Sequence, residues 1–215
     1  MSDVARLIRE EEPDLLLMQE ATQSMDALTQ EVGGHYLRSP LPRGIHGLAI
    51  WSRAPLSSPP LVLALPPGAM IERVSQILDV GDFAIANVHL SHGQVLNRRQ
   101  LRCIAEVLPS RAAVLGDYNL VGPALLPGFR DVGPRVHTHI AGDLVPLRID
   151  RCLVRGLACV EARALTRLSS DHRPIVVRLD TTTHTHPWSV RPSRRQRWRM
   201  SLRRAASRVS SLHGL

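Results

Sequence analysis

Short apolar runs of strand length recur along this chain of 215 residues, and most of them end in a polar or acidic residue. An unbroken run such as Leu15–Met18 is typical of a strand that is buried on both faces. Gly81 and Asp82, between two such runs, are a hairpin signal. We predict strands over residues 14–20, 46–52, 73–80, 83–90, 112–119, 148–156 and 174–180.

Helical patterns are fewer than strand patterns. Val4, Leu7 and Ile8 form one apolar stripe behind Ser2, a suitable N-cap, and they predict a helix over residues 3–12. We also predict helices over residues 24–32 and 96–108. Because strands outnumber helices and come in adjacent pairs, the pattern disfavours a simple alternation of strand and helix. It favours a mixed, layered α/β fold.

The positive charge of the chain is concentrated near its C-terminal end. The net charge is +8, yet residues 1–180 contain 19 basic and 19 acidic residues. Residues 181–215 contain eight arginines and no acid. We therefore place the end of the domain at residue 180 and predict a basic tail, either disordered or an amphipathic helix after Pro192. Such a tail would attract phosphate backbones or an anionic membrane surface.

The cysteines and the apolar runs bear on the compartment of the protein. Cys103, Cys152 and Cys159 are an odd number without metal-ligand spacing, so we expect buried free thiols in a reducing compartment. No apolar run approaches the roughly 20 residues of a membrane-spanning helix. The charged first segment also lacks the features of a signal peptide. We expect a cytoplasmic protein.

Polar residues that can serve phosphoryl chemistry follow several of the predicted strands. Their carboxylate and amide oxygens suit Mg²⁺, Mn²⁺ or Ca²⁺, and histidine is the natural general acid or base near neutral pH. Taken singly, such a carboxylate is more often a helix cap or a solvated loop residue. Taken together, they predict a site at one edge of the sheets. The candidates are Glu20, Asp117, Asn119, Asp150, Asp171 and His172, with His89 at the end of a further strand.

Five motifs stand in a fixed order along the chain, namely PDLLLMQE, ANVHL, LGDYN, RID and SDHRP. This ordered set resembles the endonuclease/exonuclease/phosphatase family, whose members include deoxyribonuclease-like phosphodiesterases, and the resemblance spans residues 13–179. The resemblance implies a layered β-sandwich flanked by helices. It also implies hydrolysis of phosphodiester bonds with a divalent cation, Mg²⁺ or alternatively Mn²⁺ or Ca²⁺.

The resemblance implies roles for the oxygen donors. Glu20 matches the glutamate of the family that binds the catalytic metal, and Asp171 matches a carboxylate beside that metal. Asp117 and Asn119 match the pair that orients the attacking water and contacts the phosphate.

The resemblance also implies two proton-transfer pairs. His172 matches the catalytic histidine, and Asp150 matches the aspartate that hydrogen-bonds it. His89 matches a second histidine, which pairs with a glutamate, and Glu72 is the candidate partner. An aspartate beside a histidine favours the imidazolium and raises the pKa of the histidine.

The chain departs from the family pattern at its beginning. Family members carry an Asn-bearing strand before the QE motif, whereas no Asn precedes Asn87 here. We therefore expect the first strand to be missing, with unpaired backbone groups beside the site and reduced stability. Tyr118 replaces the family phenylalanine, a mild change. We interpret His137 and His139 as surface histidines, because an HTH sequence is a weak metal signal.

The sequence favours one function and leaves two alternatives open. We expect a monomeric, divalent-metal-dependent hydrolase that cleaves phosphodiester bonds, with nucleic acid as the first substrate class. The first alternative is a phosphatase or phosphodiesterase that acts on phospholipid headgroups or small phosphoesters. The second is a truncated, non-catalytic phosphate-binding relic.

Overall fold

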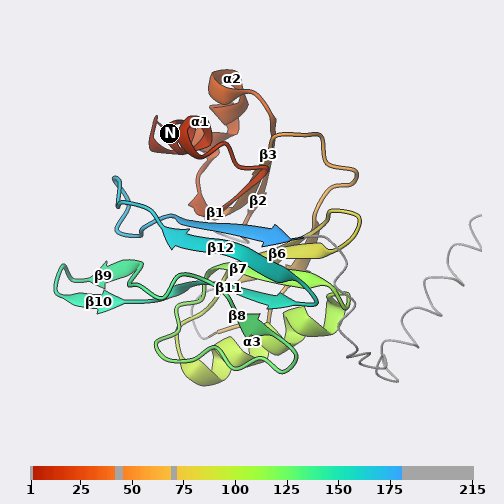
Figure 1. Cartoon of the computed structure of the whole chain (residues 1–215), viewed down its shortest axis with the longest axis vertical. Helices are drawn as coiled ribbons and strands as arrows, with labels where there is room; N and C mark the ends of the chain where they lie inside the picture. The colour runs from red at the N-terminus through yellow and green to blue at the C-terminus, as the bar shows by residue number, and fades with distance from the viewer. Residues whose placement is uncertain (1, 42–45, 69–71, 181–215) are drawn as a thin grey trace, which may run out of the picture. The chain divides into compact units, whose positions relative to one another are not determined.

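The computed structural model describes residues 2–41, 46–68 and 72–180 (Figure 1). All of these described residues belong to one compact unit. The predicted basic tail, residues 181–215, lies outside the described residues. None of the described helices is both long enough and apolar enough to span a bilayer.

The largest sheet has six strands in the order β4-β5-β6-β7-β11-β8. These strands span Leu61–Ala64, Val74–Asp79, Ala84–His89, Ala112–Asp117, Asp150–Arg155 and Arg130–Asp131. All neighbours are antiparallel except β6 and β7, which run parallel. A parallel pair needs a crossover connection, and helix α3 (Gln94–Val107) provides it.

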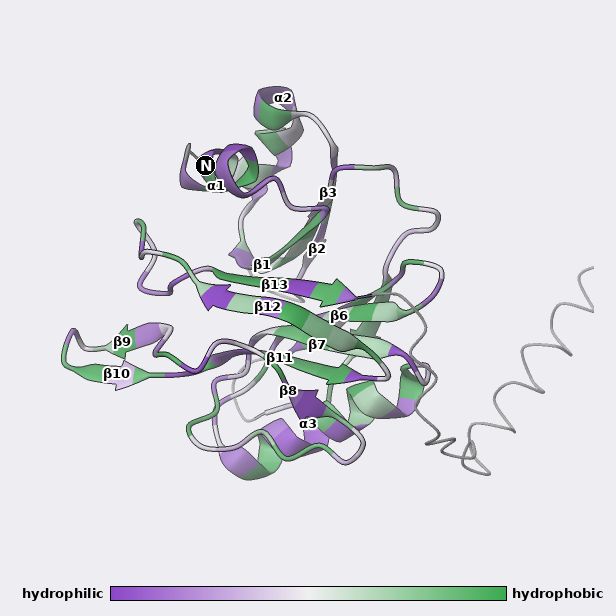
Figure 2. Ribbon diagram, viewed as in Figure 1, coloured by the Kyte–Doolittle hydropathy of each residue, from purple (hydrophilic) through white to green (hydrophobic). Residues whose placement is uncertain are grey.

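Alternating side chains of the six-stranded sheet build two separate parts of the core. Ala86 and Val88 of β6 face α3 and pack against its Leu101 and Ile104. Ile85, which directly precedes Ala86 in the strand, packs in a different cluster on the opposite face. This period of two is the one expected of a strand buried on both faces. Figure 2 shows these inner strands as mostly hydrophobic.

A second β layer covers the face of the six-stranded sheet that is opposite α3. It contains a three-stranded sheet in the order β1-β3-β2 and the antiparallel pair β12-β13. These strands span Leu15–Ala21, Gly47–Ser52, His35–Pro40, Ala158–Ala164 and Ile175–Asp180. Leu17 of β1 and Val177 of β13 both pack on the cluster that contains Ile85.

Helices cover the outer side of the three-stranded sheet. Ile8 of α1 (Ser2–Glu11) and Leu28 of α2 (Leu28–Val32) pack with Trp51 of β3. In Figure 1, α1 and α2 lie on one side of the strands and α3 lies on the other. The predicted layered β-sandwich flanked by helices is therefore confirmed.

Asn87 joins the two β layers at the centre of the molecule. Its side chain is fully buried and extends from β6 into the second layer. Its amide nitrogen donates to the backbone oxygens of Met18 and Ala49, at 3.2 and 3.1 Å. Its amide oxygen accepts a 2.7 Å hydrogen bond from Gln19. Because these polar groups satisfy one another, they hold β1, β3 and β6 in one fixed arrangement.

The predicted strands are all present, but several elements lie outside the predictions. The helix predicted over residues 24–32 is a 3₁₀ turn, Gln23–Ala27, followed by the short helix α2. Strands β2, β4, β8 and β12 were not predicted, and neither was the hairpin of β9 (His139–Ala141) and β10 (Val145–Leu147). Cys152 is buried as expected, whereas Cys103 and Cys159 are only half-buried. None of the three forms a disulfide within the described residues.

In the part of the chain that the structure describes, one edge of strand β1 is unpaired. Within the described residues, β1 pairs only with β3, and β13 pairs only with β12. Arg53 N–H donates to Asp14 O, so by alternation the next hydrogen-bonded pairs are Leu16 with Trp51 and Met18 with Ala49. The backbone amides of Leu15 and Leu17 therefore point away from β3.

We predict that hydrogen exchange will distinguish the two edges of β1. The amides of Leu15 and Leu17 should exchange faster than those of Leu16 and Met18, because only the latter donate to β3. Exchange followed by NMR on the whole chain measures this residue by residue. Equal protection along β1 would mean that another segment covers the free edge.

Candidate active site

Three predicted site residues stand in one row across neighbouring strands. His89 at the end of β6 lies opposite Asp117 at the end of β7, and Asp117 lies opposite Asp150 at the start of β11. Gly116, just before Asp117, allows the close approach of β6. A Cβ there would lie 2.0 Å from the Val88 carbonyl oxygen. The register thus places the row at one edge of the six-stranded sheet.

Asp117 is the centre of this row and is almost completely buried. One carboxylate oxygen accepts a 2.8 Å hydrogen bond from the backbone N–H of Asn119, and the other lies 3.3 Å from Nε2 of His89. Burial, with the negative charge of Asp150, raises the pKa of Asp117 to about 6. Burial, with nearby positive charges, lowers the pKa of His89 to about 3. His89 is therefore a neutral imidazole at neutral pH.

Asp150 and His172 form the second pair, as predicted. Nδ1 of His172 lies 2.9 Å from a carboxylate oxygen of Asp150. Burial by itself lowers the pKa of His172, but the hydrogen bond and charge of Asp150, with further help from Asp117 and Asp171, outweigh burial and raise it to about 9. His172 is thus held as an imidazolium, while His89 stays neutral.

Two residues fix the loop that carries His172. The hydroxyl of Thr138, which is fully buried, accepts a 3.0 Å hydrogen bond from the backbone N–H of Asp150. Arg173 donates from its backbone N–H to Thr138 O at 2.7 Å and from its guanidinium to the carbonyl oxygens of His137, Leu165 and Ala164. These bonds tie the segment before β9 to the loop before β13.

Glu20 reaches the site from the second β layer. The pairing of β1 with β3 shifts register between Met18 and Ala21, and Glu20 in this bulge has a left-handed φ of 54°. A bulge redirects a side chain, and strained backbone of this kind is frequent at functional sites. The negative charges of Glu20 and Asp117 both act on the guanidinium of Arg73, so these two carboxylates flank the same cation.

Arg73 is a site residue that the sequence analysis missed. It precedes β5 and is only 8% exposed. Within the described residues its guanidinium forms no hydrogen bond or ion pair, and its Nε is buried without a partner. Burial lowers its pKa, and Asp117 and Glu20 oppose this effect. A buried guanidinium without a direct partner is costly, and an anionic ligand would satisfy it.

The oxygen donors fit the divalent cation that the resemblance implies. Asp117 and Asp150 are buried side by side, and their repulsion disfavours ionisation of Asp117. A cation would relieve that repulsion. The carboxylates of Glu20, Asp117 and Asp171 and the amide of Asn119 are hard ligands of the kind that Mg²⁺ prefers. Glu20 and Asp171 are exposed and accessible.

Two predictions about individual residues are corrected by the structure. The carboxylate that contacts His89 is Asp117, whereas Glu72 is exposed and forms no ion pair within the described residues. His137 is exposed, as expected of a surface histidine. His139 is wrongly placed in that class, because its side chain is only 16% exposed and its ring lies against His172.

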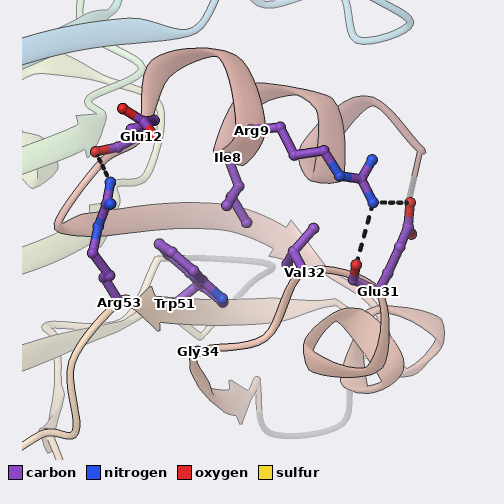
Figure 3. A pocket seen from close by; sticks show the side chains of 8 residues that line it. All are labelled: Ile8, Arg9, Glu12, Glu31, Val32, Gly34, Trp51 and Arg53. Atoms are coloured by element: carbon purple, nitrogen blue, oxygen red, sulfur yellow. Dashed lines mark hydrogen bonds and ion pairs between the residues drawn. The ribbon is translucent and has the colours of Figure 1, made fainter.

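A shallow hollow of the surface lies between α1, α2 and β3 (Figure 3). Both of its arginines are already engaged. Arg9 binds Glu31 at 3.3 Å, and Arg53 donates to the backbone oxygen of Glu12. Trp51 forms the apolar floor and donates to Gly33 O at 2.9 Å. No predicted site residue lines this hollow, so it does not belong to the candidate active site.

Comparison with known protein families gives a direct match. A model of the Endonuclease/Exonuclease/phosphatase family matches residues 1–172. Because the match covers most of the chain, the chain belongs to this family. No curated protein sequence matches the chain.

Several solved structures resemble the described fold. A functionally unknown conserved protein from Enterococcus faecalis V583 gives a TM-score of 0.66 at 18% identity, over 83% of this chain and 89% of that one. TDP2 from D. rerio, complexed with a single-strand DNA product, gives 0.66 at 15% identity over 83% and 90%. NExo, a 3'-5' exonuclease from Neisseria meningitidis, gives 0.61 at 20% identity over 83% and 94%. At these identities the similarity shows the fold.

We predict that Asp150→Asn will lower the pKa of His172 from about 9, because it removes the negative charge of Asp150, which opposes the effect of burial. An NMR titration of the imidazole measures the change. In the unmodified chain this raised pKa stabilises the fold fully below about pH 6.5, the ordinary value, and the stabilisation is lost as the pH rises through about 9. Asp171→Asn, at an exposed position, should lower the pKa much less. An equal fall in both variants would contradict the assigned hydrogen bond.

We predict opposite effects on stability from two arginine substitutions. Arg73→Met should raise the free energy of unfolding by on the order of 1 kcal/mol, because it removes a buried charge that has no direct partner. Arg151→Met should lower it, because Arg151 is equally buried but binds Asp131 at 3.1 Å. Denaturant unfolding of both variants measures this. Destabilisation by Arg73→Met would indicate a structural partner for Arg73.

Proposed function

We propose that this member of the endonuclease/exonuclease/phosphatase family hydrolyses phosphodiester bonds in nucleic acid with the help of a divalent cation. The observation that carries the proposal is the buried guanidinium of Arg73, which has no hydrogen bond within the described residues and lies beside the row His89, Asp117 and Asp150. A phosphate group supplies the anionic oxygens that such a guanidinium binds.

The protonation states support different roles in proton transfer for the pair Asp150–His172 and the pair His89–Asp117. His172, held as an imidazolium by Asp150, is suited to donate a proton to the leaving oxygen or to stabilise charge on the phosphate. Asp117, whose pKa is raised toward neutrality, is suited to accept a proton from the attacking water. Neutral His89 and the backbone N–H of Asn119 hold its two oxygens in place.

The remaining residues would bind and orient the substrate. Glu20 and Asp171 would hold the cation, which when bound would neutralise charge on the phosphate oxygens. The side chain of Asn119 donates to Leu90 O at 3.0 Å, and its backbone is left-handed, with φ at 47°. This fixes the Asn119 amide beside Asp117, where its oxygen would contact the water or the cation. Glu72 has no role in this arrangement.

We favour nucleic acid as the substrate because proteins of similar structure bind DNA. The TDP2 structure contains a single-strand DNA product, and a NExo structure contains a product DNA hairpin. Positive charge acts at this position, with Arg73 and His172 as the largest charged contributors to the lowered pKa of His89. A polyanionic strand is attracted to such a site.

We predict cleavage of plasmid DNA and of bis-p-nitrophenyl phosphate that requires Mg²⁺ or Mn²⁺. The variants His172→Ala and Asp117→Asn should each reduce the rate by about 10²–10⁴-fold, because each removes a proton-transfer group. His137→Ala is the matched control, since this exposed histidine lies outside the site. Folding of each variant is checked by circular dichroism.

The outcomes separate the candidate functions. Cleavage that persists without a divalent cation or in His172→Ala would overturn the proposed mechanism. Activity only on p-nitrophenyl phosphate or on phospholipid headgroups would move the substrate to the small phosphoesters. No activity on any of these substrates, with Mg²⁺ and with Mn²⁺, would favour a non-catalytic phosphate-binding protein.

A further inference from the structure

His139, Asp171 and His172 form a compact group of possible metal ligands that shares Asp171 and His172 with the candidate active site. One ligand atom from each lies within 4.8 Å of the others. The centroids of the two imidazole rings lie 4.6 Å apart, and the ring planes are tilted by 38°. A backbone bridge also pairs residue 139 with residue 172. The group is thus formed by two chain segments that are tied directly to each other.

His172 is oriented as a metal ligand by Asp150. Its Nδ1 is engaged with the carboxylate of Asp150, so its Nε2 is the nitrogen that an ion would bind, with release of the Nε2 proton to solvent. Histidines that bind metals commonly donate their other ring N–H to a carboxylate in this way, which fixes the ring and strengthens the ligand.

His139 carries an unsatisfied nitrogen toward the same place. Its Nδ1 is buried and has no hydrogen-bond partner within the described residues. The nearest carboxylate oxygen, on Asp171, lies 3.6 Å away, which is too far for a hydrogen bond. A buried nitrogen without a partner is unfavourable, and a metal ion between it and Asp171 would satisfy both groups. Asp171 is 70% exposed, so an ion can reach the group from solvent.

The donor set selects a class of metal. Two imidazole nitrogens and one carboxylate are the three-ligand set of open zinc sites, and nitrogen donors favour Zn²⁺, Co²⁺ or Ni²⁺ over Mg²⁺. The oxygen-donor set of Glu20, Asp117, Asp171 and Asn119 has the opposite preference. The two sets share Asp171 but differ in chemistry.

We infer that His139, Asp171 and His172 bind a transition-metal ion such as Zn²⁺, and that this ion inhibits the hydrolase. The inhibition rests on the proposed function. Once its Nε2 is coordinated, His172 can no longer transfer a proton, and Asp171 is withdrawn from the catalytic cation. The hydrogen bonds of Arg173 to both segments hold the ligands close enough for little rearrangement on binding.

The binding test does not depend on activity. The full chain is titrated with Co²⁺ and followed by its visible absorption, and with Zn²⁺ by calorimetry. We expect one ion with the absorption of a four- or five-coordinate site, and binding at least about tenfold weaker in His139→Asn and in Asp171→Asn. His137→Asn is the matched control, and His184→Asn with His186→Asn tests the other HTH sequence of the chain. Unchanged binding in His139→Asn and Asp171→Asn, or loss in a control, would overturn the site.

The inhibition test uses the Mg²⁺-supported reaction of each variant relative to its own rate without Zn²⁺. Half-inhibition by Zn²⁺ should need at least about tenfold more ion in His139→Asn than in the unmodified chain or in His137→Asn. Equal sensitivity, with binding abolished, would overturn the inhibitory role. If no variant hydrolyses any substrate, the proposed function fails, whereas the Co²⁺ and Zn²⁺ titrations still decide the site. Circular dichroism checks folding, and Asp171→Asn, at an exposed position, is the variant least able to disturb it.

Discussion

The parallel pairing of β6 with β7 is the constraint on which the site depends. It brings the ends of both strands to the same edge of the sheet, so that His89 and Asp117 lie opposite each other. The pairing requires a crossover, and α3 supplies it while burying Leu101 and Ile104 against the sheet. The antiparallel β11 then adds Asp150 to the same row. The packing of α3 in the core and the alignment of the three site residues therefore both follow from the parallel pairing of β6 with β7.

The inner strands could be predicted from sequence because burial on both faces leaves a plain apolar signal. Residues 83–90 and 112–119 show this, and both contain strands of the central sheet. Strand β12, Ala158–Ala164, could not be recognised, since it is half-exposed and places Glu161 and Arg163 among small residues. The two or three residues of β8, β9 and β10 are too short for any periodicity.

The site was predictable to the extent that its residues belong to motifs. The contact between Asp150 and His172 follows the resemblance, and the structure forms it. Arg73 and His139 carry no signal of their own, because their importance arises from burial and from neighbours distant in sequence. The pairing of His89 with Glu72 failed for the same reason. Sequence proximity to a strand does not specify which carboxylate the three-dimensional register will place beside the imidazole.

The buried amide of Asn87 has a further consequence for how the chain finds its fold. If β6 were shifted by one residue against its neighbours, every side chain would change faces, and Asn87 would meet Leu101 and Ile104 instead of Gln19 and the carbonyl oxygens of β1 and β3. The unpaired amide would cost roughly 1–3 kcal/mol. Small apolar residues such as Ala84 and Ala86 penalise that slip much less. One polar side chain thus helps the chain discriminate against misaligned sheets that its apolar residues alone would tolerate.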